Sequence, residues 1–414
     1  MEKMYRLYSS LSELENYKKR ADVDLSALRH NYRLLKEQFL SNGSHPRVIS
    51  VVKADAYGHG APACVRALLD EGCDFFAVSC IDEAVAVRNV CDRLQKKADV
   101  LILGYTDPSL AAQLARYDII QALLSAEHAH LLNHAAHAAD LPVRVHAALD
   151  TGMNRIGFSA YSEASQAESV TQLIQVASYS NLNLEGLFTH FCRADETPGG
   201  SGDAFTAKQL QRFLTVCQAL EEQGITSLFR HACNSAAAVR FPEFHLDGVR
   251  LGIVLFGAPP SNQFSNLPLR PVLKLKTVIS HIHTLPPGET VGYGGCFSAK
   301  GERRIATLPI GYADGLLRGF VGGTVTVHTV AGDRRVPTVG RICMDQCMLD
   351  VTDTDARVGD TVTLFGNCPG ELSEYAARAN TIDYECLCLI SSRVPRRYCG
   401  EDTEILTDTE VRSE

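Results

Sequence analysis

Between residues 22 and 255, eight short runs of strand-forming residues alternate with longer segments that have the apolar periodicity of helices. The strand-type runs are 48–52, 75–79, 100–103, 119–122, 143–149, 184–190, 228–231 and 248–253, and the helical segments are 25–39, 61–70, 82–94, 108–116, 126–139, 163–177 and 203–223. This alternation predicts βαβ units with parallel strands. Eight units in about 230 residues favour a closed (β/α)8 TIM-type barrel, which takes about 250 residues, and the count leaves an open doubly wound sheet as the alternative.

A different pattern begins after Gly257. Residues 258–268 are rich in Pro, Ser and Asn, as a domain boundary is expected to be. The later strand-type runs are 272–285, 303–308, 324–330, 335–339, 346–351 and 361–364, and residues 371–379 have helical periodicity. We therefore predict a leader of residues 1–20, either a short polar helix or disordered, a barrel of residues 21–265, and a mostly-β C-terminal domain of residues 266–414.

The charge balance and the cysteines narrow the class of protein. The chain has 40 Lys and Arg against 48 Asp and Glu, which argues against a general nucleic-acid binder. No apolar run approaches the ~18 residues of a membrane span. The 14 cysteines include no Cys-x-x-Cys pair and no zinc-type spacing with histidine, so we expect reduced thiols, no metal and a cytoplasmic location.

Lys53 directly follows the first strand-type run. In a barrel, the carboxyl ends of the strands carry the active site, so this lysine is a candidate functional residue. Partial burial lowers the pKa of a lysine and makes it a better nucleophile. The alternative is a lysine that simply extends from a strand end into water.

Ser235 follows the seventh strand-type run, and Gly252 lies in the eighth. A serine hydroxyl and a backbone N–H next to a glycine can together hold a phosphate. Taken singly, residues of these types are more often an ordinary helix cap and a turn glycine. Combined with Lys53, they match pyridoxal 5'-phosphate (PLP), a cofactor with one aldehyde and one phosphate.

Nine motifs occur in a fixed order along residues 22–400. They are VVKADAYGHG (51–60), LDTGMNRIG (149–157), THFCRADE (189–196), HACNSAAA (231–238), VRLGIVLFG (249–257), VGYGG (291–295), LPIGYADG (308–315), GRICMDQ (340–346) and SRVPR (392–396). In content and order they resemble the motifs of the alanine racemase family. The resemblance implies a PLP-binding barrel with a β-rich second domain, a small amino-acid substrate, and a homodimer whose two active sites each include residues of the partner subunit.

The resemblance also implies which groups move protons. Lys53 would bond to the cofactor aldehyde and act as base on the D-face of the substrate, and the partner subunit's Tyr293 would act on the L-face. Racemisation needs such a pair because the proton leaves one side of a planar carbanion and returns to the other side.

Other residues match family positions motif by motif. The cofactor-binding residues would be Lys53, Tyr57, His190, Ser235, Arg250, Gly252 and Ile253, the substrate-binding residues Arg155, Met344 and Tyr312, and the supporting residues His231 and Asp345. Met344 would come from the partner chain, and Tyr312 would form the substrate gate. Arg250 would contact the ring nitrogen of PLP, where related decarboxylases place a carboxylate, and it therefore favours racemisation.

Two positions depart from the family pattern. Ala148 stands where many members have a carbamylated lysine that orients the arginine corresponding to Arg155, so that a bound anion or Asn154 would have to take this role. Ser392 stands where the family usually has a tyrosine that reaches the phosphate and narrows the pocket.

The predicted function is PLP-dependent interconversion of L- and D-alanine, which supplies D-alanine for peptidoglycan. Ser392 motivates the alternative of a serine or broad-specificity racemase with the same fold. Three further alternatives are a non-catalytic PLP carrier, a barrel decarboxylase and a structural barrel without cofactor. The second domain with Tyr293 argues against the carrier, and Arg250 argues against the decarboxylase.

Overall fold

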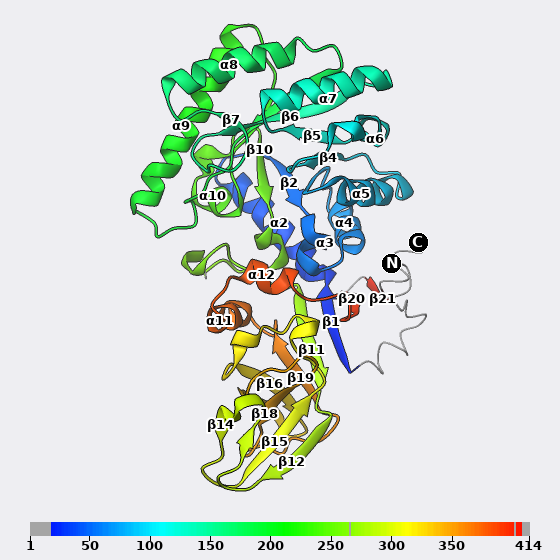
Figure 1. The fold of residues 1–414 in the computed structure, drawn as a ribbon, viewed down its shortest axis with the longest axis vertical. Helices are drawn as coiled ribbons and strands as arrows, with labels where there is room; N and C mark the ends of the chain where they lie inside the picture. Colours follow the sequence, from blue (N-terminus) through cyan, green and yellow to red (C-terminus); the bar gives the residue numbers. More distant parts are fainter. Residues whose placement is uncertain (1–17, 265, 401–402, 408–414) are drawn as a thin grey trace.

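The computed structural model describes residues 18–264, 266–400 and 403–407. A barrel fills the upper half of Figure 1 and a sheet domain the lower half, and two short helices, α11 (Glu371–Arg378) and α12 (Asp383–Cys388), lie between them. Residues 1–17 of the predicted leader lie outside the described residues. Lys19 and Arg20 belong to a strand, not to a polar helix.

Eight parallel strands form a closed barrel, which confirms the predicted fold and excludes the open sheet. In chain order the strands are β2 (Arg47–Val51), β3 (Phe75–Val78), β4 (Asp99–Ile102), β5 (Ile120–Leu123), β6 (Val143–Asp150), β8 (Leu182–Phe188), β9 (Phe229–His231) and β10 (Gly248–Leu251). Each strand pairs with the next, β5 pairs with β6, and the pairing of β10 with β2 closes the ring. The short strand β7 (Phe158–Ser159) pairs with the carboxyl end of β6.

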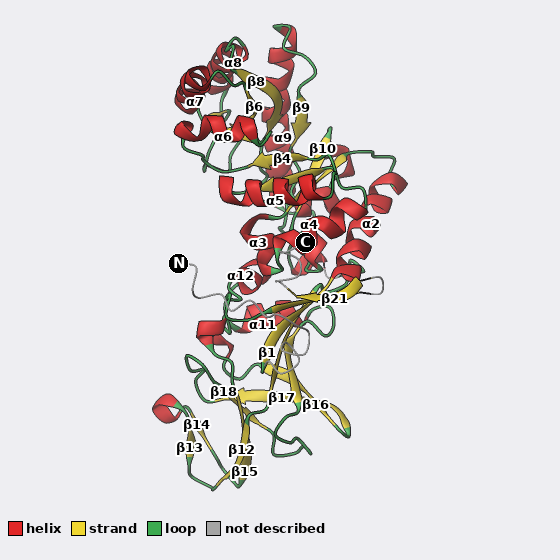
Figure 2. Ribbon diagram, turned by 90° about the vertical axis from the view of Figure 1, so that its right-hand side faces the viewer, coloured by secondary structure: helices red, strands yellow, loops and turns green. Residues whose placement is uncertain are grey.

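Helices surround this ring (Figures 1 and 2). They are α2 (Leu25–Ser41), α3 (Lys53–Gly58), α4 (Ala61–Asp70), α5 (Ile81–Arg93), α6 (Ala111–Arg116), α7 (Ala126–Ala139), α8 (Glu163–Ala177), α9 (Ser201–Glu222) and α10 (Ser235–Arg240), with short 3-10 turns at Pro108–Leu110, Pro242–Phe244, Ile253–Phe256 and Asn262–Phe264. The bounds predicted for α4, α7 and α8 are confirmed to the residue. Because the helices cover the outer face, β3 and β5 are buried at every position, and β3 is apolar throughout.

The second part is built on a ten-stranded sheet, which confirms its predicted β-rich character. The strand order is β12-β15-β18-β17-β16-β19-β11-β1-β20-β21. The bounds are β1 (Lys19–Asp24), β11 (Leu273–Val278), β12 (His281–Leu285), β15 (Arg303–Leu308), β16 (Thr324–Thr329), β17 (Gly332–Val339), β18 (Cys347–Asp350), β19 (Thr361–Phe365), β20 (Arg396–Gly400) and β21 (Thr403–Thr407). A separate hairpin, β13 (Thr290–Val291) and β14 (Phe297–Ser298), encloses a 3-10 turn at Tyr293–Gly295, and two more such turns lie at Tyr312–Asp314 and Arg318–Phe320.

The structure differs from the prediction at several elements of this domain. The single run 272–285 is two strands, because the chain turns at Ile279 and Ser280, whose N–H groups donate to Asp360 and Thr307. The helix α12 and the strands β13, β14, β20 and β21 were not predicted. Neither was β1, which starts the described chain and pairs with β11 on one side and β20 on the other.

Charged residues explain why β1 has no apolar signature. Asp22 in this strand is buried, and its carboxylate forms ion pairs with Arg397 at 2.8 Å and Lys276 at 3.0 Å. A strand with a buried ion-pair network does not show the alternation of apolar and polar residues by which strands are predicted. Within the described ranges, no helix has the length and apolar content needed to cross a membrane.

Asn31 fastens α2 to the chain that connects the two parts. Its side chain is fully buried. Its Nδ2 donates to the carbonyls of Leu255 at 3.0 Å and Arg270 at 2.9 Å, and its Oδ1 accepts the N–H of Arg270 at 2.9 Å. One amide side chain therefore satisfies three backbone groups, and the carbonyl of Leu255 is buried with it.

We expect Asn31→Leu to lower the free energy of unfolding by about 2–4 kcal/mol, because leucine leaves these three backbone groups without partners. Urea denaturation followed by circular dichroism measures the loss. The matched control is Asn183→Leu at an exposed position of β8, which should change stability by less than about 0.5 kcal/mol. Similar stabilities of the two variants would contradict the role given to Asn31.

Candidate active site

A cavity of about 1010 Å³ lies at the carboxyl ends of the barrel strands. Eight of the predicted site residues line it together: Lys53, Tyr57, Arg155, His190, Ser235, Arg250, Gly252 and Ile253. The sheet domain supplies another part of the wall through α11 and α12, including Ser373, Ile382 and Cys388. These eight residues lie on or directly after five different barrel strands, and they meet in one space that both parts of the molecule enclose.

Lys53 precedes a turn with unusual backbone geometry. Ala54, Asp55, Ala56 and Tyr57 have φ values of 52° to 54° and form one turn of left-handed helix. For residues with a Cβ atom this conformation costs about 1–2 kcal/mol each, so tertiary contacts must hold it. The turn brings both Lys53 and Tyr57 to the cavity.

Polar contacts hold the second half of this left-handed turn. Nδ1 of the fully buried His59 lies 3.0 Å from the carbonyl oxygen of Ala56 and 2.9 Å from that of Tyr57. Arg396 on β20 donates through Nε to the carbonyl of Gly58 at 3.0 Å. Because Arg396 belongs to the sheet domain, the geometry of the turn depends on both parts of the molecule.

The environment of Lys53 shifts its amine toward the neutral form. Burial lowers the pKa of Lys53 below the ordinary value, and the positive charge of Arg155 lowers it further. Glu83 opposes this with a smaller effect, as Cys388 would in its thiolate form. The neutral amine is the form that attacks an aldehyde, so this cavity suits a nucleophilic lysine.

Tyr57, Ser235, Gly252 and Ile253 provide hydroxyl and N–H groups close together. The N–H of Gly252 donates to Oγ of Ser235 at 3.0 Å. A Cβ atom on Gly252 would lie 2.4 Å from Oη of Tyr57, so a side chain at this position would displace the phenol. Small polar donors that converge in this way suit the oxygens of a phosphate.

Arg250 is a buried cation whose guanidinium donates hydrogen bonds to neutral acceptors. Its Nη2 donates to the carbonyls of Thr189 at 2.7 Å and Ala232 at 2.8 Å, and its Nη1 donates to Nδ1 of His231 at 2.8 Å. Burial lowers the pKa of Arg250 to about 10, which leaves the guanidinium charged at neutral pH. Nη2 also lies 3.4 Å from Nδ1 of His190, which connects two predicted cofactor-binding residues.

His146 on β6 extends this network and was missed from the sequence. Nε2 of His231 lies 3.1 Å from Nδ1 of His146. Because Arg250 can only donate, His231 accepts at Nδ1 and carries its proton on Nε2, from which it donates to His146. Gly186 leaves space for the ring, since a Cβ atom there would lie 2.7 Å from Cε1 of His146. A histidine inside an apolar strand was the signal in the sequence that could have found it.

Asp150 shapes the loop that carries Arg155. Its carboxylate accepts the N–H groups of Gly152 at 3.0 Å, Asn154 at 3.0 Å and Arg155 at 3.1 Å. Asp150 is nearly fully buried, whereas the side chain of Arg155 is exposed. The loop backbone is therefore organised by one carboxylate, and the guanidinium remains accessible from the cavity.

Ala148 does not replace the family's modified lysine by another polar group. It packs in a small buried apolar cluster with Ala122 and Phe188. The contacts that organise the neighbouring loop come from Asp150 instead. The anion expected beside Arg155 stays a prediction.

Four predicted residues lie away from the cavity, in the sheet domain: Tyr293, Tyr312, Met344 and Asp345. Tyr293 is 70% exposed and Met344 54% exposed. Asp345 forms an ion pair with Arg393 at 2.7 Å. The departure position Ser392 is also exposed and does not line the cavity. Within one chain the structure therefore does not bring Tyr293 to Lys53.

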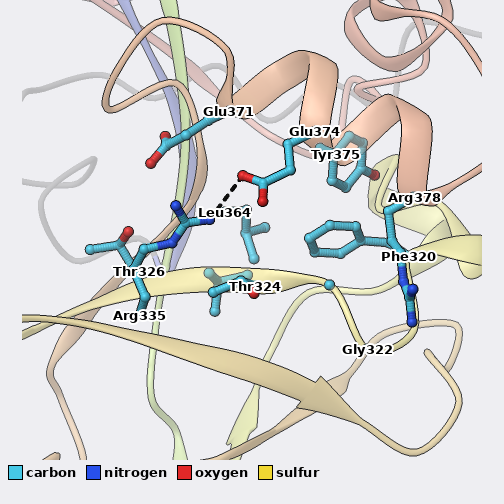
Figure 3. A pocket seen from close by; sticks show the side chains of 12 residues that line it. Phe320, Gly322, Thr324, Thr326, Arg335, Leu364, Glu371, Glu374, Tyr375 and Arg378 are labelled. Carbon is cyan, nitrogen blue, oxygen red and sulfur yellow. Dashed lines mark hydrogen bonds and ion pairs between the residues drawn. The ribbon is translucent and has the colours of Figure 1, made fainter.

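A smaller hollow of about 200 Å³ lies between β16 and α11 (Figure 3). Arg335 and Glu374 form an ion pair of 2.9 Å on one side, and Arg378 lies on the other. None of the predicted site residues lines this hollow. In the described part of the chain, no group of three or more His, Cys, Asp or Glu is arranged to hold a metal, and none of the 14 cysteines there forms a disulfide bond.

Comparisons with known proteins agree with this arrangement. The family model described as alanine racemase, N-terminal domain matches residues 23–260, and the model described as alanine racemase, C-terminal domain matches residues 272–398. The chain is 40% identical over 386 residues to the alanine racemase of Clostridium tetani, which covers 91% of this chain and 94% of that protein. It is also 40% identical over 380 residues to the alanine racemase of Desulfovibrio desulfuricans, with 91% and 97% covered.

Solved structures give the same result. The structure of alanine racemase from Clostridium difficile 630 has a TM-score of 0.83 to this chain at 35% identity, and 95% of this chain and 99% of that chain are covered. The alanine racemase from Streptomyces coelicolor A3(2) has a TM-score of 0.84 at 32% identity, with 92% and 98% covered.

The buried histidines predict how acid affects stability. Burial lowers the pKa of His59 to about 4 and that of His146 to about 3, from an ordinary 6.5. Below about pH 6.5 the unfolded chain therefore binds protons that the folded chain does not, and stability falls toward these folded pKa values. We expect His146→Asn to flatten the decrease by up to about 1.4 kcal/mol per pH unit.

Urea denaturation at a series of pH values between about 7 and 5 measures this slope. His134→Asn, at an exposed position on α7, is the matched control and should leave the slope as in the wild type. An unchanged slope in His146→Asn would show that His146 is not held neutral in the folded protein.

Proposed function

Since the chain belongs to the alanine racemase family and is therefore an isomerase, we propose that it interconverts L- and D-alanine with PLP as its cofactor. One observation carries the proposal most directly. Lys53, with a pKa lowered by burial, lies in the same cavity as the Ser235 and Gly252 donors and the buried cation Arg250. These are the groups needed to hold an aldehyde, a phosphate and a ring nitrogen.

The residues present fit PLP. Tyr57, Ser235 and the N–H groups at Gly252 and Ile253 would hold the phosphate. Lys53 would bond to the aldehyde, and Arg250 would hold the ring nitrogen. When bound, PLP supplies an electron-withdrawing system that makes the Cα proton of an amino acid removable. A permanent cation at the ring nitrogen keeps that nitrogen unprotonated, which favours racemisation over decarboxylation.

We propose that Lys53 and Tyr293 move the protons. Lys53 would act on one face of the substrate Cα, and the partner subunit's Tyr293 would act on the opposite face. The high exposure of Tyr293 and Met344 supports this, because both side chains are free to reach a second subunit. The active unit would then be a homodimer with two shared sites.

Arg155 would bind the substrate carboxylate, with the partner subunit's Met344 beside it and Tyr312 at the gate. The fork of guanidinium donors suits a carboxylate, and the Asp150 contacts would keep the loop in place. Product D-alanine would serve peptidoglycan synthesis. The 14 cysteines, none of which forms a disulfide bond in the described residues, support a reducing compartment such as the cytoplasm.

The dimeric site predicts complementation between two inactive variants. We expect Lys53→Ala to be inactive and Tyr293→Phe to lose about 100- to 10,000-fold in kcat. After mixing and subunit exchange in equal amounts, hybrid dimers would contain one intact site, made of Lys53 from one subunit and Tyr293 from the other. Racemase activity should therefore recover to about a quarter of the wild-type value.

A further readout separates the two bases. In Tyr293→Phe, D-alanine should still exchange its Cα proton with solvent deuterium, because Lys53 serves that face, while L-alanine forms about 100- to 10,000-fold more slowly than in the wild type. No recovery on mixing, with dimers demonstrated by light scattering, would contradict the shared site. Retained racemisation in Tyr293→Phe would contradict the role of the phenol.

Ser392 supports a second candidate, a serine or broad-specificity racemase. The position is exposed, and a serine there leaves more space than the family's tyrosine. We expect Ser392→Tyr to raise the ratio of kcat/KM for L-alanine over L-serine by about tenfold, because pocket size discriminates substrates by about 1–3 kcal/mol. Ser392→Ala is the matched control for loss of the hydroxyl. An unchanged ratio in Ser392→Tyr would show that this position does not set specificity.

A further inference from the structure

Glu83 links the ends of two neighbouring barrel strands through one carboxylate. It lies in the first turn of α5, and its side chain is partly buried. Oε1 accepts the N–H of Ala54 at 2.6 Å, and Oε2 accepts the N–H of Ser79, which follows β3, at 2.8 Å. The same side chain therefore ties the left-handed turn after β2 to the loop after β3.

The contact with Ala54 acts on the stretch of four consecutive residues with left-handed backbone geometry. Ala54 is the neighbour of Lys53 and the first of the four left-handed residues. His59 and Arg396 hold the end of the turn, and Glu83 holds its beginning. Loss of the Glu83 contact would free the backbone directly after Lys53 and, with it, the direction in which the amine enters the cavity.

Groups from four elements interact electrostatically with Lys53. They are Arg155 after β6, His190 after β8, Cys388 at the end of α12 and Glu83 on α5. Burial lowers the pKa of His190 and raises that of Cys388, so both are uncharged at neutral pH. Of these four groups, Glu83 therefore brings the negative charge that opposes the effect of Arg155.

We propose that Glu83 is a positioning residue for Lys53, which holds the turn so that the amine points into the cavity and places a carboxylate on that side of the ammonium. The inference rests on the proposed function, since it concerns the residue that would bond to PLP. Helix capping is the simpler explanation, because acidic side chains stabilise the first turn of a helix. The two explanations differ in that capping changes the stability of α5 and leaves the chemistry of Lys53 unchanged.

The test replaces Glu83 with glutamine, which keeps the size and removes the charge. The amide would also direct its own hydrogens at one of the two N–H donors. In the PLP-free protein, Lys53 is acetylated at a series of pH values and the labelled peptide is quantified by mass spectrometry. We expect the midpoint of labelling to move to lower pH, because the carboxylate no longer stabilises the ammonium. In the PLP-loaded enzyme, kcat for L-alanine should fall about tenfold or more.

Two further variants complete the test. Glu185→Gln is the matched control, because Glu185 on β8 pairs with Arg144 near the amino end of the barrel, and it should change neither readout. Glu83→Asp keeps the charge and withdraws the carboxylate by one methylene group. Glu83→Asp should retain the wild-type labelling midpoint and still have a lower kcat than the wild type. It replaces Glu83→Gln in the test if the glutamine variant does not fold.

The outcomes separate the two proposals. A lower unfolding midpoint in Glu83→Gln, with labelling and kcat as in the wild type, would make Glu83 a helix cap only and overturn the inference. Wild-type kcat in Glu83→Asp would overturn the proposal that Glu83 holds the turn in the position that catalysis needs. If the wild-type protein racemised no amino acid but Glu83→Gln still shifted the labelling of Lys53, the proposed function would fail and the positioning role would stand.

Discussion

Three cations, Lys53, Arg155 and Arg250, share one cavity, and much of the site serves to keep them there. In the described part of the chain, none of them forms an ion pair with a carboxylate. Their mutual repulsion and lost hydration must therefore be balanced by neutral acceptors around Arg250 and by the fold itself. An anionic cofactor and a substrate carboxylate would offset this repulsion. The positive charge of the cavity therefore matches the negative charge of the proposed ligands.

Both parts of the molecule build the site. The sheet domain closes the cavity with α12, and its Arg396 holds the carbonyl of Gly58 at the end of the left-handed turn. The approach is close, since a Cβ atom on Gly58 would lie 2.3 Å from the carbonyl oxygen of Leu387. The same domain exposes Tyr293 on another element, which in the proposed dimer would serve the partner's cavity. A barrel without this domain would retain Lys53 but lose the contacts of Arg396 and α12 that shape its surroundings.

Local patterns predicted the elements whose signals are local. The bounds of α7 and α8 were predicted to the residue because Ser125 and Ser162 cap helices whose apolar residues repeat regularly. β1 could not be predicted, because its burial depends on ion pairs between Asp22 and residues far along the chain. The contacts of Glu83 and His146 were missed for the same reason, since each joins strands that are separate in the sequence.

The sequence by itself determined the barrel, the β-rich second domain, the family and the set of residues that could bind a cofactor, because strand ends and motifs are local features of the chain. Only the tertiary structure decided the left-handed turn after Lys53, the carboxylate that holds it and the protonated nitrogen of His231. These depend on hydrogen bonds between residues that are far apart in the chain, 29 positions for Ala54 and Glu83 and 85 positions for His146 and His231. They also depend on burial that no local pattern specifies. A hydrogen bond requires a particular distance and direction, and only the packed chain provides both.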